Sequence, residues 1–257
     1  MNRNTVTTNR PVKRKIANRN ATIITYFNKN HDGVGASYLY RILYKSFTPP
    51  NTAAIRFIRL PLDNKSSLLI KRSIDIILSV VVITCVLSWF IPLMAVLIKT
   101  TSCGPVFFLQ KRTKRNGTTF TCIKFRSMIV NNSADILPAA ENDNRVTKLG
   151  TIMRKTFIDE LPQFFNVLWG DMSVVGPRPH MLSESLRFEE HIKYYSYREK
   201  VKPGITGLSQ IMGLEGAANT VQKMKDRIDI DVFYLRHWTL KLDMIILYRT
   251  FLKILGM

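Results

Sequence analysis

The most pronounced pattern along the chain is an uncharged apolar segment at residues 76–98, with the sequence IILSVVVITCVLSWFIPLMAVLI. As a helix rising ~1.5 Å per residue it would be roughly 34 Å long, which is enough to cross a lipid bilayer. A buried helix of a soluble domain is the alternative, but the segment is long and has no polar stripe. The pattern therefore predicts a membrane-associated helix.

The flanks of this segment bear on its topology. Lys71 and Arg72 precede it and Lys99 follows it, and cationic flanks favour the cytoplasmic side of a membrane. Pro92 removes a backbone donor and bends a helix. A helix that enters the membrane, breaks near residues 88–92 and returns to the same face satisfies both flanks, whereas an ordinary span satisfies one of them. The residues alone leave both topologies open.

Downstream of the apolar segment, strand-like and helix-like patterns alternate. Two β-prone runs flank Asn116 and Gly117, which tolerate positive φ, so the pattern predicts a β-hairpin. Helical spacing follows at residues 148–158 and 160–170. Residues 173–179 are then predicted to form a short strand that runs into a rigid turn, and residues 183–200 an amphipathic helix. The acidic pair Asp159 and Glu160 would then lie at the start of the second helical segment. The mixture of elements predicts an α+β fold.

The C-terminal stretch, residues 236–257, also has helical spacing. Its apolar positions share one side of a helix, which would comprise Trp238, Leu242, Ile245, Ile246, Leu252 and Leu255. Lys241, Arg249 and Lys253 would remain available to lipid headgroups, so we expect an amphipathic helix at the membrane surface. A core helix of the soluble domain is the alternative.

The charge balance points to anionic partners. The chain has 38 Lys and Arg against 18 Asp and Glu, a net charge of +20. Residues 1–65 hold twelve of the basic residues against Asp32 and Asp63, and we interpret them as a separate basic arm of unknown role, with a transit peptide as the rival interpretation. No nucleic-acid recognition motif accompanies the charge, and a long apolar segment fits poorly with such a role. A phosphorylated metabolite or an acidic lipid surface fits better.

The acidic pair Asp159 and Glu160 has two interpretations. Acidic residues at a helix start are stabilising by roughly 0.5–1 kcal/mol each and need no further function. A carboxylate can also attack phosphorus or bind a divalent cation, and basic side chains can hold phosphate oxygens. The basic residues in nearby polar segments are Lys124, Arg126, Arg145, Arg154 and Arg178. Such a set suits phosphoryl transfer.

The stretch from Lys71 to the C-terminus resembles the bacterial sugar transferases, the monotopic polyprenol-phosphate phosphoglycosyl transferases. The resemblance runs through KRSIDIILS, GPVFFLQKR, KFRSM, RKTFIDELPQFFNVLWGDMSVVGPRPHM, KPGITGLSQ and DVFYLRHWTLKLDMIILYRT, in the order of the family. It implies transfer of a sugar 1-phosphate from a UDP-sugar to undecaprenyl phosphate, with release of UMP, at the start of capsule, exopolysaccharide or O-antigen synthesis. A membrane scaffold without catalytic activity is the rival class, and the intact acidic pair weighs against it.

The resemblance also assigns expected roles. It implies that Asp159 is the nucleophile of a covalent phosphosugar intermediate and a ligand of Mg²⁺, and that Glu160 is its partner carboxylate. Arg126, Arg154 and Arg178 would meet substrate phosphates, with Lys124 and Arg145 as weaker candidates. The implied partners are the UDP-sugar, undecaprenyl phosphate and membrane lipid, without nucleic acid, and a homo-oligomer is left open.

The expected organisation combines the charge pattern, which defines residues 1–65, with the resemblance, which covers the rest. Residues 1–65 would be the basic arm, residues 66–100 a re-entrant membrane helical hairpin, and residues 101–257 a compact cytosolic catalytic domain with amphipathic interfacial helices. The protein would reside in the bacterial inner membrane with its catalytic domain facing the cytosol. Glucose-type members show an Arg-Gly-Glu-Thr run where this chain has residues 215–218, so the identity of the sugar stays open.

Overall fold

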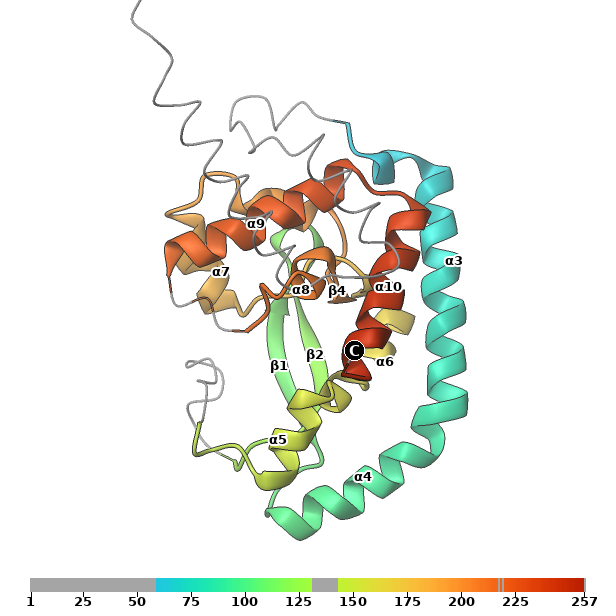
Figure 1. Cartoon of the computed structure of the whole chain (residues 1–257), viewed down its shortest axis with the longest axis vertical. Helices are drawn as coiled ribbons and strands as arrows, with labels where there is room; N and C mark the ends of the chain where they lie inside the picture. The colour runs from blue at the N-terminus through green and yellow to red at the C-terminus, as the bar shows by residue number, and fades with distance from the viewer. Residues whose placement is uncertain (1–58, 131–142, 217, 219, 257) are drawn as a thin grey trace, which may run out of the picture. The chain divides into compact units, whose positions relative to one another are not determined.

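The computed structural model describes residues 59–130, 143–216, 218 and 220–256 (Figure 1). The chain divides into two compact units, Met1–Asn51 and Thr52–Met257, and every described residue belongs to the second. Most of the predicted basic arm, residues 1–58, therefore lies outside the described residues. The expected division at residues 65 and 100 stays a prediction.

The apolar segment forms one long helical stretch, Lys65–Thr101, preceded by the short turn η2 (Pro61–Asp63). It consists of α3 (Lys65–Val82), a π-helical turn η3 (Ile83–Leu87) and α4 (Ser88–Thr101). It is long and apolar enough to cross a membrane, and Figure 1 shows that its two arms meet at a bend. The irregularity lies one turn before Pro92, because proline leaves the carbonyl of residue 88 without its helical donor and crowds that turn.

Side-chain hydroxyls satisfy backbone carbonyls around the bend. Thr84 Oγ1 donates to the carbonyl of Val80 at 2.8 Å, and Ser88 Oγ donates to the carbonyl of Thr84 at 2.7 Å. Trp89 Nε1 donates to the carbonyl of Cys85 at 2.9 Å. These bonds satisfy polar backbone groups that lipid could not satisfy, so the bend is compatible with an apolar environment.

The N-terminal arm of this helix is fastened to the rest of the unit by polar contacts. Lys71 Nζ lies 2.6 Å from Asp243 Oδ2, with both side chains buried. Asp75 Oδ1 accepts hydrogen bonds from Ser173 Oγ at 3.0 Å and from the amide of Val174 at 2.8 Å. The two terminal nitrogens of Arg72 donate to the carbonyls of residues 167 and 168 at 2.6 and 2.8 Å.

The C-terminal arm is held by apolar packing instead. Met94 and Ile98 form a buried cluster with Phe125 and Met153. Between these two attachments large apolar side chains such as Val81 and Trp89 are exposed. Both arms of the long helix therefore contact the same compact unit, and in its middle Leu87 is buried while other apolar side chains are exposed.

The predicted β-hairpin is confirmed. Strands β1 (Phe107–Thr113) and β2 (Thr119–Phe125) pair antiparallel, with Phe107 opposite Phe125 and Thr113 opposite Thr119. The connecting turn η4 (Arg115–Gly117) places Asn116 at φ 63° and Gly117 at φ 72°. These two residue types tolerate such angles, which is why the turn forms here.

The remaining elements surround this hairpin (Figure 1). In chain order they are α5 (Lys148–Lys155), η5 (Ile158–Glu160), α6 (Gln163–Trp169), β3 (Ser173–Val175), α7 (Leu182–Glu189), η6 (Tyr195–Lys200), β4 (Gly204–Thr206), α8 (Leu208–Ile211), α9 (Val221–Arg236) and α10 (Leu240–Ile254). Strands β3 and β4 pair in parallel. The described residues form a mixed arrangement of helices and two small sheets.

Two predicted boundaries in this part are wrong. The helix expected over residues 183–200 ends at Glu189, and η6 follows it. Tyr194, which directly precedes η6, has φ −111° and ψ 17°, so the backbone leaves the α-helical region between the two elements. The acidic pair lies in the separate turn η5 rather than at the start of α6, which begins at Gln163 after Pro162.

Helix α10 exposes a different face from the predicted one. Trp238, which precedes it, and Leu242 and Ile246 within it are buried in the core, as the core-helix alternative proposed. Arg249 is buried as well, so it is not available to headgroups. The exposed face carries a second apolar stripe, which consists of Leu240, Met244, Tyr248, Phe251, Ile254 and Leu255.

Candidate active site

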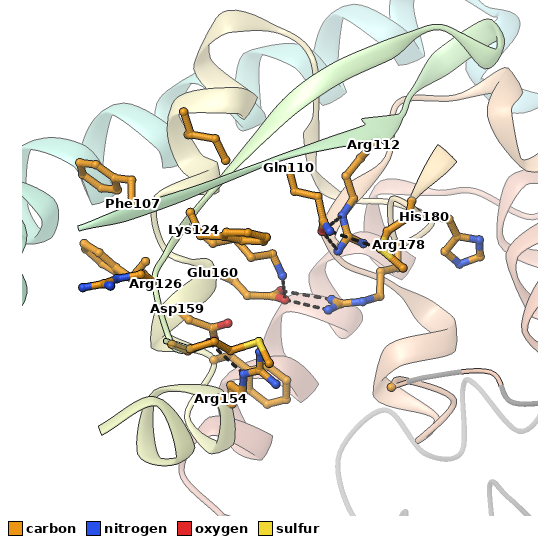
Figure 2. Close-up of a pocket in the computed structure, with 18 of the residues that line it drawn as sticks. Phe107, Gln110, Arg112, Lys124, Arg126, Arg154, Asp159, Glu160, Arg178 and His180 are labelled. Carbon is orange, nitrogen blue, oxygen red and sulfur yellow. Dashed lines mark hydrogen bonds and ion pairs between the residues drawn. The ribbon is translucent and has the colours of Figure 1, made fainter. Parts of the chain in front are cut away.

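A cavity of about 650 Å³ lies beside the β-hairpin and the turn η5. Its size is typical of pockets for small-molecule ligands. Six of the seven residues predicted from the sequence line it, namely Lys124, Arg126, Arg154, Asp159, Glu160 and Arg178 (Figure 2). Arg145 does not line it, and its guanidinium binds the carboxylate of Asp143 instead.

The turn η5 presents both acidic side chains to this cavity. Phe157, directly before it, has a φ of 56°, which is unusual for a bulky side chain. Asp159 and Glu160 follow in the single turn, and both are buried. The pair occupies the first turn of η5, and α6 starts three residues after Glu160.

Glu160 is held between two cations (Figure 2). Lys124 Nζ lies 2.6 Å from Oε1 of Glu160, and Arg178 donates through two nitrogens at 2.8 and 3.2 Å. Burial alone would raise the pKa of Glu160, but Arg178 and Lys124 outweigh it and hold that pKa well below its usual range. Glu160 is therefore a permanently charged anchor for these two cations.

Asp159 has a different environment. Its side chain makes no hydrogen bond or ion pair with the residues that the structure describes, although the residue is only 8 % exposed. Burial raises the pKa of Asp159 to about 6, with the attraction of Lys124 opposing this and the repulsion of Glu160 adding to it. Asp159 is thus ionised at neutral pH, and its oxygens are not committed to a protein partner.

Arg154 lies beside Asp159 (Figure 2). Its Nε donates to Ser127 Oγ at 2.9 Å, and among the described residues its two terminal nitrogens have no hydrogen-bond partner. Burial lowers the pKa of Arg154, while Asp159 opposes that shift. The guanidinium is therefore fixed by one bond and keeps two donors for an anion.

Arg126 is used differently from the expected phosphate contact. Its terminal nitrogens donate to the backbone carbonyls of Cys103 and of Ser102, the latter at 2.8 Å. In Figure 2 its guanidinium points away from Glu160. These bonds join the wall of the cavity to the residues that directly follow α4.

Sequence reasoning missed several residues that line the cavity. Arg112 donates to the carbonyl of Pro179 at 2.7 Å and to Oε1 of Gln110, which is next along the same face of β1. The alternation of side chains in the predicted hairpin could have identified them, because residues 110 and 112 lie on the same face of the hairpin as Lys124. The predicted hairpin therefore already implied a shared cationic surface.

His180 and Arg227 were missed for another reason. His180 Nδ1 lies 2.5 Å from the hydroxyl of Tyr195, and its Nε2 lies 3.4 Å from Arg227. Burial lowers the pKa of His180 well below its usual value, and the surrounding arginines lower it further. A neutral histidine here is a hydrogen-bonding element of the wall. Arg227 comes from the distant helix α9, so no local pattern places it at the cavity.

Among the described residues, no cluster of three or more His, Cys, Asp or Glu side chains could hold a metal ion by itself. Within the described part of the chain, the Asp159 carboxylate has no hydrogen-bond partner, whereas Glu160 is already bound by Lys124 and Arg178. Mg²⁺ commonly binds through one or two carboxylates, with water and substrate phosphates completing its shell. The donor set fits a Mg²⁺ ion that binds together with a phosphorylated substrate.

Comparison with known proteins places these residues in a family. Residues 66–257 match the family described as Bacterial sugar transferase. The chain is 46 % identical over 191 residues to the UDP-glucose:undecaprenyl-phosphate glucose-1-phosphate transferase of Klebsiella pneumoniae, a match covering 74 % of this chain and 41 % of that protein.

Two further relatives differ in name and in length. The chain is 43 % identical over 190 residues to the UDP-N-acetylgalactosamine-undecaprenyl-phosphate N-acetylgalactosaminephosphotransferase of Aeromonas hydrophila, covering 72 % of this chain and 44 % of that protein. It is 39 % identical over 188 residues to the exopolysaccharide production protein PSS of Rhizobium leguminosarum bv. phaseoli, covering 71 % of this chain and 94 % of that protein. The chain thus spans less than half of the first two relatives and nearly all of the third. It belongs to the bacterial sugar transferase family.

Proposed function

We propose that this protein transfers a sugar 1-phosphate from a UDP-sugar to undecaprenyl phosphate through a covalent intermediate on Asp159. The observation that carries the proposal is the contrast within the acidic pair. Glu160 is neutralised by Lys124 and Arg178, whereas Asp159 is ionised at neutral pH and has no partner among the described residues. A buried carboxylate in that state, within a cationic cavity, is suited to attack a phosphorus atom.

In the first step, an Asp159 oxygen attacks the phosphorus that carries the sugar. A carboxyl–phosphorus bond forms, the bond from that phosphorus to the bridging oxygen breaks, and UMP leaves with the electron pair. The free donors of Arg154 and the cation pair around Glu160 supply positive charge where the phosphate oxygens would lie. These cations also lessen the repulsion between the anionic nucleophile and the anionic donor.

In the second step, a phosphate oxygen of undecaprenyl phosphate attacks the same phosphorus. The bond to Asp159 breaks, the carboxylate is regenerated, and the product is a sugar attached to the lipid through a diphosphate. The acceptor must reach the cavity from the membrane. In support of this, Arg126 joins the cavity wall to the backbone that directly follows the apolar helix.

Mg²⁺ fits this proposal with Asp159 as its protein ligand. When bound, the ion would screen the charge of the phosphate oxygens. The residues of the chain perform the remaining tasks: Asp159 attacks, Arg154 and Arg178 hold phosphate oxygens, and Glu160 keeps Lys124 and Arg178 in place.

We further propose that the helix Lys65–Thr101 dips into the cytosolic leaflet of the inner membrane and returns to the same side. The support is that both arms contact one compact unit, through Lys71 and Asp75 at one end and Ile98 at the other. A spanning helix would separate these attachments by the thickness of a bilayer. Residues 66–100 would form the membrane helix, and residues 101–257 the cytosolic catalytic domain.

The exposed stripe of α10 would lie on the same membrane surface. Members such as Met244, Tyr248 and Phe251 are three or four residues apart, so one exposed side of the helix is apolar along its length. Such a face is favourable at the boundary between headgroups and acyl chains.

The donor would be a UDP-hexose. The names of the two longer relatives specify glucose in one and N-acetylgalactosamine in the other, so they do not narrow the sugar further. A panel of UDP-glucose, UDP-galactose and their N-acetylated counterparts, each with undecaprenyl phosphate, would identify it by UMP release.

The test of the covalent mechanism combines two measurements. Incubating the purified protein with the preferred donor and no acceptor should add the mass of one sugar phosphate to the peptide that contains Asp159. Asp159→Asn should abolish both this adduct and UMP release while keeping the melting temperature, since an amide keeps the shape but cannot attack phosphorus. An Asp159→Asn enzyme with activity within a few-fold of the parent would show that the mechanism is wrong.

A further inference from the structure

The cavity contains more carboxylates than its proposed chemistry uses. Besides Asp159 and Glu160, it is lined by Glu184 and Glu215. A carboxylate repels phosphate, so neither of these two can serve the diphosphate of the donor. They are instead suited to accept hydrogen bonds from neutral hydroxyl or N–H groups.

Glu215 is anchored beside the turn η5, which carries Asp159 and Glu160 and is called the catalytic turn below. Its Oε2 contacts Lys253 Nζ, and the same Nζ donates to the carbonyl of Gln210 at 3.2 Å and lies 5.7 Å from the centre of the Phe157 ring. Phe157 also lines the cavity, two residues before Asp159. Glu215 is therefore connected through one lysine to the residue that introduces the turn η5.

The backbone around Glu215 is fixed as well. Arg227, which is buried, donates from Nε to the carbonyl of Leu214 at 2.8 Å and from a terminal nitrogen to the carbonyl of Gly216 at 2.6 Å. The residues on either side of Glu215 are thus held by one guanidinium. A side chain set in this way has a defined position before any ligand binds, which reduces the entropy lost on binding.

One oxygen of Glu215 remains available. Lys253 contacts Oε2, while Oε1 has no hydrogen bond to the described residues, and the side chain is 31 % exposed. The charge of the carboxylate is partly offset by Lys253, so Glu215 can line a cavity for an anionic substrate without repelling it strongly. Glu184, by contrast, interacts electrostatically with Arg112 and Arg227 rather than with the catalytic turn.

We infer that Glu215 is a specificity-determining residue that accepts hydrogen bonds from ring hydroxyls of the donor sugar. This inference rests on the proposed function, in which the sugar is attached to the phosphorus that Asp159 attacks and so lies next to the catalytic turn. Glu215 is the carboxylate anchored there without being part of the acidic pair. The site would accept neutral hexoses and disfavour UDP-uronic acids, whose sugar carboxylate would face that of Glu215.

The test measures binding rather than turnover. In the Asp159→Asn background, which cannot consume the donor, calorimetry would give dissociation constants for UDP, for UDP-glucuronic acid and for four neutral donors. These are UDP-glucose, UDP-galactose, UDP-N-acetylglucosamine and UDP-N-acetylgalactosamine. Glu215→Gln should weaken the tightest neutral donor by roughly 10- to 100-fold, the range for a hydrogen bond to a charged group, and leave UDP unchanged. UDP-glucuronic acid should bind more tightly, a gain that a misfolded variant cannot produce.

The control is Glu190→Gln, an exposed glutamate outside the cavity, which should change none of these constants. An equal loss of affinity for UDP and for the neutral donor would mean that Glu215 supports the whole cavity, and the inference would be wrong. Unchanged affinity for every ligand would also overturn it. Failure of the parent to release UMP would reject the proposed function instead, and the binding constants would still decide the role of Glu215.

Discussion

Replacing Glu160 by glutamine should destabilise the protein, because its one carboxylate forms ion pairs with two partly buried cations. Lys124 lies 2.6 Å from it, and Arg178 donates two hydrogen bonds at 2.8 and 3.2 Å. Glutamine keeps the shape but offers one acceptor oxygen, and its NH₂ group would face donors. At least one cation therefore loses its partner and stays largely out of water.

The expected loss in the free energy of unfolding can be estimated from the burial of the three side chains. Glu160 is 7 % exposed, Lys124 14 % and Arg178 23 %. Removing one partner of a fully buried pair costs about 3–5 kcal/mol, and the residual exposure of the cations reduces this to about 2–4 kcal/mol. For a unit of this size, each kcal/mol lowers the melting temperature by about 2–4 °C, so we expect a decrease of about 4–16 °C.

The pH dependence of this loss has a definite sign. The folded pKa of Glu160 is depressed below its ordinary value of 4.5, so its contribution to stability is fully present above that value. It is lost as the pH falls through the depressed folded pKa. The difference in stability between the parent and Glu160→Gln should therefore be fully present at pH 8 to 7, where Asp159 is ionised, and should shrink in acidic solution below pH 4.5.

Thermal melts followed by tryptophan fluorescence in detergent would measure the difference. The matched control is Asp171→Asn, which breaks the ion pair of Lys114 and Asp171, whose side chains are 30 % and 28 % exposed. That change should cost less than about 1 kcal/mol. A Glu160→Gln protein that melts within 2 °C of its parent would refute the assigned role of Glu160.

Three further outcomes are expected. Turnover should fall as the pH drops through about 6, because protonated Asp159 is not a nucleophile, and a flat kcat/KM profile between pH 8 and 5 would contradict this. Cysteine reporters placed before Lys71 and after Lys99 should both be labelled from the cytosol, whereas periplasmic labelling of either would exclude the re-entrant topology. Phe251→Gln combined with Leu255→Gln should raise the KM for undecaprenyl phosphate several-fold and leave that for the UDP-sugar unchanged; equal changes in both would argue against a membrane-facing α10.

The sequence predicted those parts of the fold that depend on neighbouring residues. The hairpin was predictable because Asn116 and Gly117 determine its turn locally. The cationic setting of Asp159 was predictable because its basic neighbours occur in short recognisable stretches. Arg227 was not, because α9 reaches the cavity through tertiary packing that no sequence spacing records.

Helix α10 shows where periodicity is ambiguous. Its sequence contains two apolar stripes, and a helical period cannot say which of them faces the core. The buried Asp243, bound to Lys71 from a segment far away in the chain, decides the orientation. The same limit applies to Arg126, whose hydrogen bonds go to backbone carbonyls at the end of α4 and are invisible in the sequence.

The contacts of α3 with the core have a consequence for biogenesis. Asp75 accepts a hydrogen bond from the amide of Val174 in β3, and Lys71 neutralises the buried Asp243 of α10. Until the apolar helix is in place, the amide of Val174 lacks the acceptor that Asp75 provides, and Asp243 lacks its salt bridge to Lys71, although Tyr234 and Trp238 still donate hydrogen bonds to it. Burying the Asp243 charge without that cation is unfavourable. A polypeptide whose apolar helix is misplaced should therefore fail to complete this core. Under the proposed function, this would restrict the folded enzyme to the membrane surface where its lipid acceptor would reside.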